Sequence, residues 1–351
     1  MSEELILADV IEGIPHPGEC RELVGHREAV EGFLERYRSG KLHHAHLVTG
    51  PKGIGKVTFA LKMAGHLFRY PDPASAPVSL ENSSTTRDAV DGKIAAASHP
   101  NLLHLSRPWD FKEKKFKTKL TVDEVRLTVP FFGTSKAEKG WRVAIIDAVD
   151  DMNQNASNAL LKILEEPPER TVFFVIAHSA ATVLPTIRSR CQHLVLKPLE
   201  GDEVLSVLDG FDIGSNLSSE DRKLLATLAD GSVRSAITLA HEDGLELYRD
   251  FNILVGDLSK PDWAGIHSLA EKVSLRAKED RYRLLLRFAE QFMEAKARGS
   301  ATDSPDISVL ARWAEVWEKT RNSIRTADAY NLDRKQTVLN LFSEMGEVVR
   351  R

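Results

Sequence analysis

The first half of the chain alternates short, mostly apolar runs with segments of helical periodicity. The apolar runs predict strands at 44–49, 102–105, 143–146, 172–176 and 193–196. Continuous runs of this kind, without polar alternation, are typical of strands that are buried on both faces of a parallel sheet. Helical patterns lie between the runs, for example at 57–69 and 155–166. This order predicts an α/β core, a parallel sheet flanked by helices.

The second half of the chain changes character after Pro198. Strand-like runs stop, and helical patterns follow at 200–208, 218–229 and 233–241, then in longer amphipathic stretches. We therefore predict three parts, which are an α/β core over 1–198, a small helical module over 199–243 and an all-helical domain over 244–351. Residues 70–87 are rich in Pro, Ser, Ala and Thr without periodicity, which predicts an exposed loop.

The composition of the 351 residues narrows the function classes. The net charge of −4 excludes a protein that coats nucleic acid by bulk positive charge, so any DNA contact must come from a local patch. Two cysteines, Cys20 and Cys191, are too few for a four-cysteine zinc site or a disulfide framework. No apolar stretch reaches the roughly 18 residues of a membrane helix, and the acidic N-terminus is unlike a signal peptide. We expect a cytoplasmic protein without membrane contact.

Residues 50–56 read GPKGIGK and match the phosphate-binding loop pattern G-x-x-x-x-G-K. They stand in the required context, between a predicted strand and a predicted helix. Gly50, Gly53 and Gly55 let backbone N–H groups surround a phosphate, and Lys56 would reach the outer phosphates of a nucleotide. The pattern predicts a P-loop fold.

The positions that would hold Mg²⁺ match the pattern of active P-loop ATPases less well than the phosphate loop does. A hydroxyl should follow the loop lysine, but Val57 stands there, and Thr58 is rotated by about 100° around the helix. Asp147 ends an apolar strand and is the usual acidic partner of Mg²⁺ in P-loop ATPases; its alternative interpretation is a turn residue. We therefore predict a degenerate nucleotide site.

Two further blocks carry a family resemblance. Residues 158–168 read NALLKILEEPP, and residues 189–191 read SRC. With the P-loop, they resemble bacterial clamp-loader subunits of the AAA+ family, and among these the delta-prime subunits of DNA polymerase III, in forms like those of alphaproteobacteria. Segments 23–26 (LVGH) and 98–101 (SHPN) add to the resemblance, which covers about residues 15–240.

The resemblance implies roles for two arginines. In the family, the arginine of the SRC triplet acts in trans on ATP held by a neighbouring subunit, and Arg190 occupies that position. Such an arginine finger is worth about 10³–10⁵ in rate. The alternative is a surface arginine that pairs with an acidic neighbour. Arg234 lies in a segment like the second sensor of AAA+ proteins, which contacts nucleotide from a helical lid.

Departures from the family pattern indicate a subunit that does not hydrolyse ATP. Motor-type members keep a hydroxyl and a Glu where this chain has Val57 and Ala148, and His178 stands near the usual Thr of the first sensor. Many members also carry a four-cysteine zinc module, but residues 70–98 contain no cysteine. We therefore expect no zinc or other metal and no required cofactor, with weak ATP or ADP binding left open.

The resemblance thus implies a non-hydrolysing delta-prime stator that helps to load the sliding clamp onto primed DNA. Its partners would be gamma/tau and delta subunits, the clamp, and primed DNA through the assembled complex. Residues 199–243 would form the lid, and 244–351 would join a collar of related subunits. One alternative is a gamma/tau-like motor ATPase, and another is a small-molecule P-loop kinase, which would need an arginine-rich lid that we do not find.

A basic segment at 107–119 is the local candidate for DNA contact, with aromatic residues interleaved. One interpretation is a hairpin that faces the DNA backbone without reading sequence. The other is a solvated β-hairpin whose lysines keep an edge soluble. The helix that follows is expected to begin with a capping box at 121–124. The candidate contacts are Lys112, Lys114, Lys115, Lys117 and Lys119.

Overall fold

The computed structural model of the chain describes residues 11, 14–80, 88–113, 115–133, 140–275, 278–299, 307–330 and 333–350. The chain divides into two compact units. The first contains residues up to 216 together with 226–235, and the second contains 217–225 together with 236–351. The predicted functional boundaries at 198 and 243 stay predictions.

The first unit is built on a five-stranded parallel sheet of order β2-β5-β6-β1-β7, as predicted. In this register Thr49 lies opposite Ala177, and Asp147 lies opposite Ile176. The carboxyl ends of three neighbouring strands therefore meet at one edge of the sheet. The strands are β1 (Ala45–Thr49), β2 (Leu102–Leu105), β5 (Arg142–Asp147), β6 (Thr171–Ala177) and β7 (Gln192–Val195).

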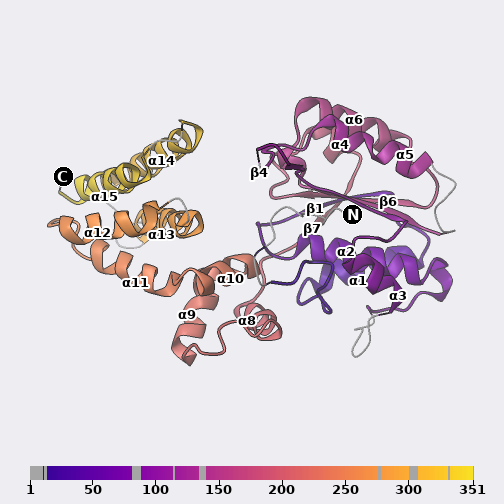
Figure 1. Cartoon of the computed structure of the whole chain (residues 1–351), viewed down its shortest axis with the longest axis horizontal. Coiled ribbons are helices and arrows are strands. Elements are labelled where there is room, and N and C mark those ends of the chain that lie inside the picture. The colour runs from indigo at the N-terminus through magenta and orange to yellow at the C-terminus, as the bar shows by residue number, and fades with distance from the viewer. Residues whose placement is uncertain are drawn as a thin grey trace. The chain divides into compact units, whose positions relative to one another are not determined.

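Helices cover both faces of this sheet (Figure 1). Successive residues of β6 alternate between two hydrophobic clusters, because side chains along a strand point to opposite faces. Phe174 packs with the helices of one face, and Phe173 packs with those of the other. Helices α1 (Arg27–Arg38), α2 (Lys56–Arg69) and α3 (Ala89–Ala95) form the first layer. The second contains α4 (Val122–Arg126), α5 (Thr128–Gly133), α6 (Gln154–Glu165) and α7 (Pro185–Arg188).

The segment predicted as an exposed loop is partly packed. A single 3-10 turn, η1 (Pro73–Ser75), is followed by Ala76, which is buried in the first cluster. Trp141 Nε1 donates to the carbonyl of Pro71 at 3.2 Å and holds the segment to the sheet. The prediction of full exposure is therefore wrong for Ala76, because its small side chain finds room against the core. Residues 81–87 lie outside the described part of the chain.

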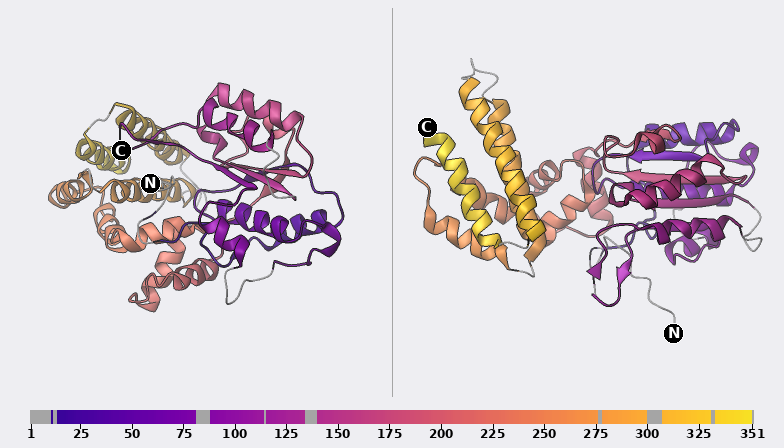
Figure 2. Two further views of the ribbon diagram at one scale, coloured as in Figure 1. Left: turned by 45° about the vertical axis from the view of Figure 1, so that its right-hand side comes forward. Right: turned by 90° about the horizontal axis from the view of Figure 1, so that it is seen from above.

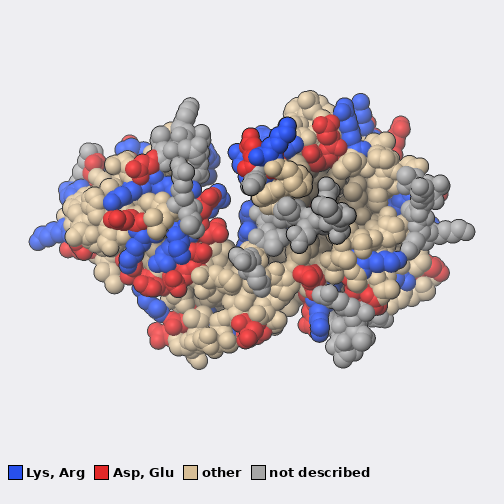
Figure 3. All heavy atoms as spheres, in the orientation of Figure 1, with Lys and Arg blue, Asp and Glu red and all other residues tan. Residues whose placement is uncertain are grey.

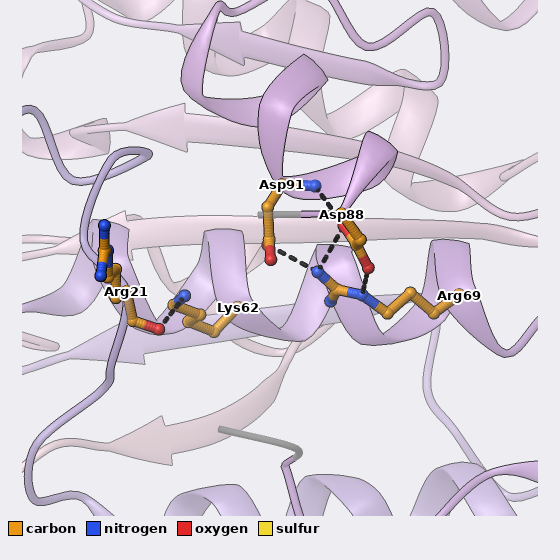
Figure 4. A network of polar contacts seen from close by, with 5 residues as sticks. All are labelled: Arg21, Lys62, Arg69, Asp88 and Asp91. Atoms are coloured by element: carbon orange, nitrogen blue, oxygen red, sulfur yellow. Dashed lines mark hydrogen bonds and ion pairs between the residues drawn. The ribbon is translucent and has the colours of Figure 1, made fainter. Parts of the chain in front are cut away.

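A polar network fastens α3 to α2 (Figure 4). Arg69, at the end of α2, contacts both carboxylate oxygens of Asp88 and lies 2.6 Å from Asp91 Oδ1. Asp88 also caps α3, since its Oδ1 accepts from the backbone N–H of Asp91 at 2.7 Å. Further along α2, Lys62 Nζ donates to the carbonyl of Arg21 at 2.6 Å. One arginine thus joins the end of one helix to the start of the next.

The rest of the chain is helical where it is described, as predicted. In the second unit, α13, α14 and α15 pack side by side (Figure 2), around a core that includes Phe251, Phe288 and Phe342. None of the described helices is long and apolar enough to cross a membrane. The helices are α8 (Gly201–Gly210), α9 (Ser219–Ala229), α10 (Val233–His241), α11 (Gly244–Val255), α12 (Trp263–Ser274), α13 (Glu279–Gly299), α14 (Ile307–Tyr330) and α15 (Arg334–Arg350).

Candidate functional site

The P-loop joins β1 to α2 at the carboxyl edge of the sheet. Gly50, Gly53 and Gly55 all have positive φ, at 149°, 81° and 98°, which L side chains rarely adopt. A Cβ at Gly50 would collide with the carbonyl of Leu196, and one at Gly53 would collide with Arg234. The loop therefore needs glycine for its backbone shape and for the close approach of neighbouring segments.

Five successive carbonyls of this loop accept hydrogen bonds from the protein itself. Lys56 Nζ donates to the carbonyls of Gly50 and Pro51, both at 2.7 Å. The other three bonds are Ser232 Oγ to Lys52 O (2.9 Å), Arg234 N to Gly53 O (3.2 Å) and His26 Nε2 to Ile54 O (2.7 Å). The lysine expected to reach phosphate thus turns back onto its own loop.

Lys56 is buried beside carboxylates. Burial lowers the pKa of Lys56 to about 8, while the negative charges of Asp147 and Asp150 act in the opposite direction. The same lysine contributes, after burial, to a lowered pKa of His178, which follows β6. The ends of β1, β5 and β6 therefore bring one cation, two carboxylates and one imidazole together.

The Mg²⁺ positions of this site are incomplete. Val57 packs against the hydrophobic core and offers no oxygen to a Mg²⁺ ion. Ala148, which is 4% exposed, stands where motor-type members carry a Glu, so no carboxylate is present there. Thr58 is half-buried in the first turn of α2. Asp147 lies at the end of β5, with its Oδ2 at 4.0 Å from His104 Nε2. The residues present fit a phosphate group but lack one of the two oxygen donors that a bound magnesium nucleotide would use.

Residues 231–234 lie directly against the P-loop. Ser232 is buried and holds the loop through its hydroxyl, and the backbone N–H of Arg234 completes the contact. Arg234 stands in the first turn of α10 and is half-buried. The structure therefore brings the backbone and Cβ of Arg234 to the loop, and its contact with nucleotide stays a prediction.

Asp150 is a site residue that the sequence did not single out. It lies in the 3-10 turn η2 (Val149–Asp151), which follows β5. Its Oδ2 accepts from the backbone N–H of His178 at 2.7 Å, and its Oδ1 accepts from Thr182 Oγ1. Asp150 thus ties the end of β5 to the loop that leads into α7.

Arg190 lies at the surface between α7 and β7. Its Nη2 donates to Glu165 Oε1 at 2.6 Å, and its Nη1 donates to the carbonyl of Thr186 at 3.0 Å. Its side chain is 37% exposed. Arg190 therefore pairs with an acidic neighbour, as the alternative interpretation expects, and the role in trans stays a prediction. The adjacent Cys191 is buried in the core, and burial raises its thiol pKa to about 12.

The basic segment forms an antiparallel hairpin of β3 (Trp109–Asp110) and β4 (Lys115–Phe116). The rings of Trp109 and Phe116 pack edge to face at 4.9 Å, and Asp110 Oδ1 accepts two backbone N–H groups in the turn. Lys and Arg side chains gather where β4 is labelled (Figures 1 and 3). The predicted capping box also forms, with Thr121 N donating to Glu124 Oε2 at 2.9 Å. The exposed lysines are Lys112, Lys115, Lys117 and Lys119, and Lys114 lies outside the described residues.

Within the residues that the structure describes, no three His, Cys, Asp or Glu side chains come together in a way that could hold a metal ion. Two half-buried or buried histidines near the sheet, His26 and His104, have pKa values lowered by burial, to about 4 for His104. The expectation of a zinc-free chain stays a prediction.

Known proteins similar to this chain include subunits of DNA polymerase III. Residues 25–200 match the family model described as DNA polymerase III, delta subunit. The chain is 28% identical over 225 residues to DNA polymerase III subunit gamma of Buchnera aphidicola subsp. Schizaphis graminum, covering 64% of this chain and 58% of that protein. It is 31% identical over 203 residues to DNA polymerase III subunit delta' of Bacillus subtilis, covering 58% of this chain and 55% of that protein.

A solved gamma subunit-related protein from Thermotoga maritima is 17% identical at a TM-score of 0.43, covering 92% of this chain and 99% of that chain. The chain spans little more than half the length of these two curated relatives.

Proposed function

The chain belongs to the family described as DNA polymerase III, delta subunit, and on that premise we propose that it is a delta-prime-like subunit of a clamp loader that does not hydrolyse ATP. One observation carries this proposal. The two positions that should supply a hydroxyl and a carboxylate for hydrolysis hold Val57, which packs against the core, and Ala148, which is buried. The phosphate loop beside them is intact, so the fold has kept its shape while losing groups that turnover requires.

In the proposed role the chain acts through Arg190. Its guanidinium is half-exposed and lies on a short connection between α7 and β7, so a neighbouring subunit can approach it. A positive charge placed there would stabilise the charge that develops on the γ-phosphate of a neighbour's ATP. The proposed partners are gamma/tau and delta subunits in the cytoplasm, with the sliding clamp and primed DNA reached through the assembly. Residues 244–351 would serve as the collar.

ATP turnover by the isolated chain and by a reconstituted loader tests this proposal. The isolated chain should show no ATPase above background. Arg190→Ala should lower DNA-dependent turnover by the loader by at least about 10³-fold at the affected site, the low end for arginine fingers, while the chain keeps its melting temperature. Robust turnover by the isolated chain would instead assign it to the gamma/tau-like motor type. Membership in this family argues against the small-molecule kinase.

A further inference from the structure

Two adjacent carboxylates in η2 have partners on two different elements. Asp151 Oδ2 lies 3.3 Å from Arg107 Nε, where the chain enters the basic hairpin. Asp150 accepts hydrogen bonds from His178 and Thr182, in the loop that leads to α7 and Arg190. The three-residue turn η2 thus contacts both the segment that enters the hairpin and the loop that precedes α7 and Arg190.

The hairpin is attached to η2 at both of its ends. Arg107 pairs with Asp151 at the entry, and at the exit the backbone N–H of Leu120 donates to the carbonyl of Asp151 at 2.9 Å. Leu120 also forms a β-bridge with Met152. A tilt of the hairpin must therefore move η2 or break contacts at both ends.

The turn itself is short and internally bonded. The N–H of Asp151 donates to the carbonyl of Ala148 at 3.0 Å, and that of Met152 donates to Val149 at 3.1 Å. On the other side, Arg188 Nη1 reaches back to the carbonyl of Ala180 at 3.5 Å, which joins α7 to the loop that Asp150 holds. The hydrogen bonds of Asp150 and Arg188 therefore provide a route by which a displacement of η2 can reach α7.

The hairpin carries the chemistry of a nucleic-acid backbone contact. Its exposed lysines outnumber Asp110 and Glu113, and Phe111 near the turn is 69% exposed. Lysines neutralise phosphates, and an exposed aromatic ring offers a surface for base stacking. Arg107 is engaged by Asp151, which leaves the lysines as the phosphate ligands.

We propose that η2 couples nucleic-acid contact at the hairpin to the placement of Arg190, with Asp150 and Asp151 as positioning residues. This inference rests on the proposed function, since it assumes that Arg190 acts on a neighbour's ATP. It adds that the hairpin contacts the DNA backbone and that a resulting displacement reaches Arg190 through the contacts of Asp150 and Asp151.

The test compares Asp150→Asn, Asp151→Asn and Thr182→Val in the reconstituted loader, with and without a primer-template duplex. Each variant should reduce the ratio of DNA-stimulated to unstimulated ATP turnover by about three- to tenfold, within the range that single residues carry between coupled sites. The KM for ATP should stay unchanged, because none of these side chains touches the neighbour's nucleotide. Thr182→Val removes one hydroxyl and keeps the side-chain volume, so it serves if Asp150→Asn fails to fold.

Asp123→Asn is the matched control, because Asp123 is an exposed carboxylate that pairs only locally, with Arg126 at 3.4 Å on α4. It should leave the ratio unchanged. A second measurement uses the isolated chain, in which Asp150→Asn should speed amide exchange across 178–190 and Asp123→Asn should not. If the η2 variants keep the wild-type ratio while Arg190→Ala abolishes turnover, the coupling is wrong and the proposed function stands. If Arg190→Ala also has no effect, both are wrong.

Discussion

Arg190 uses two different nitrogens to bind Glu165 Oε1 and the carbonyl of Thr186, at 2.6 and 3.0 Å. The guanidinium is therefore held in one orientation by Glu165 at the end of α6 and by Thr186 of α7. A single ammonium group has no planar fork and cannot reproduce this arrangement. The charge of Arg190 and its placement can thus be separated experimentally.

Arg190→Lys keeps the charge and should still fail in trans. We expect DNA-dependent turnover by the loader to fall by at least about tenfold, because both the bidentate geometry and the placement are lost. The melting temperature should change little, since the Arg190–Glu165 pair is half-exposed and worth at most about 1 kcal/mol. Wild-type turnover by Arg190→Lys would mean that charge alone suffices at this position.

Gly53→Ala should destabilise the first unit even without nucleotide. The new Cβ would meet Arg234 at a residue whose φ is 81°, so strain and a clash add. We expect a loss of about 2 kcal/mol or more, measured by urea denaturation. The matched control is Gly92→Ala, where nothing lies within 4 Å of the new Cβ in the middle of α3. This change should stabilise by about 0.5–1 kcal/mol, and equal effects at both glycines would contradict the packing argument.

Arg69→Met should loosen α3. The substitution keeps an apolar stem on α2 but removes the contacts with Asp88 and Asp91. Because the Arg69 side chain is only 23% exposed, we expect a loss of about 1–3 kcal/mol, with faster amide exchange over 89–95. Arg27→Met, which breaks an exposed pair with Glu31 on α1, should cost under about 0.5 kcal/mol. Unchanged exchange in α3 would rule out a fastening role for Arg69.

His46 should make the fold acid-sensitive. It is fully buried on β1 beside Phe33 and Phe174, and burial lowers its pKa from 6.5 to about 3. Between these pH values the unfolded chain binds a proton that the native state excludes, so stability falls as the pH drops below 6.5. His46→Leu should flatten this fall.

The measurement is the urea midpoint of the wild type and His46→Leu at pH 7 and pH 5. The variant should lose less stability between the two pH values. His267→Leu is the control, because His267 is exposed on α12 and should leave the pH dependence as it is. Identical pH dependence for the wild type and His46→Leu would show that another group, such as the half-buried His104, dominates the acid response.

The sequence predicted the sheet well because its central strands β1, β5 and β6 are contiguous apolar runs that are buried on both faces. Every residue of β6 is buried, so the apolar pattern and the strand coincide closely. The capping box at Thr121 was also predictable, since its partner is three residues away. Patterns whose partners lie a few residues apart can be recognised without knowledge of the tertiary structure.

Contacts between distant polar residues were not predictable. Asp150 meets Thr182 across 32 positions, and His26 meets the P-loop across 28, so neither pair leaves a periodic signal in the chain. The hydrogen bonds that Lys56 makes in the structure were not predictable for a related reason. Its pattern indicates a phosphate ligand, but the nearest acceptors in the fold are the carbonyls of its own loop.

The hydrogen bonds to the P-loop carbonyls change how the glycine-rich motif should be interpreted. Five carbonyls of this loop accept hydrogen bonds from the protein itself, and its glycines make room for Leu196 and Arg234. The loop therefore holds together segments that are far apart in the chain. A loop with this structural role needs its glycines whether or not a nucleotide binds. A glycine-rich signature can therefore reflect a structural requirement of the loop, and by itself it does not show that a chain hydrolyses nucleotide.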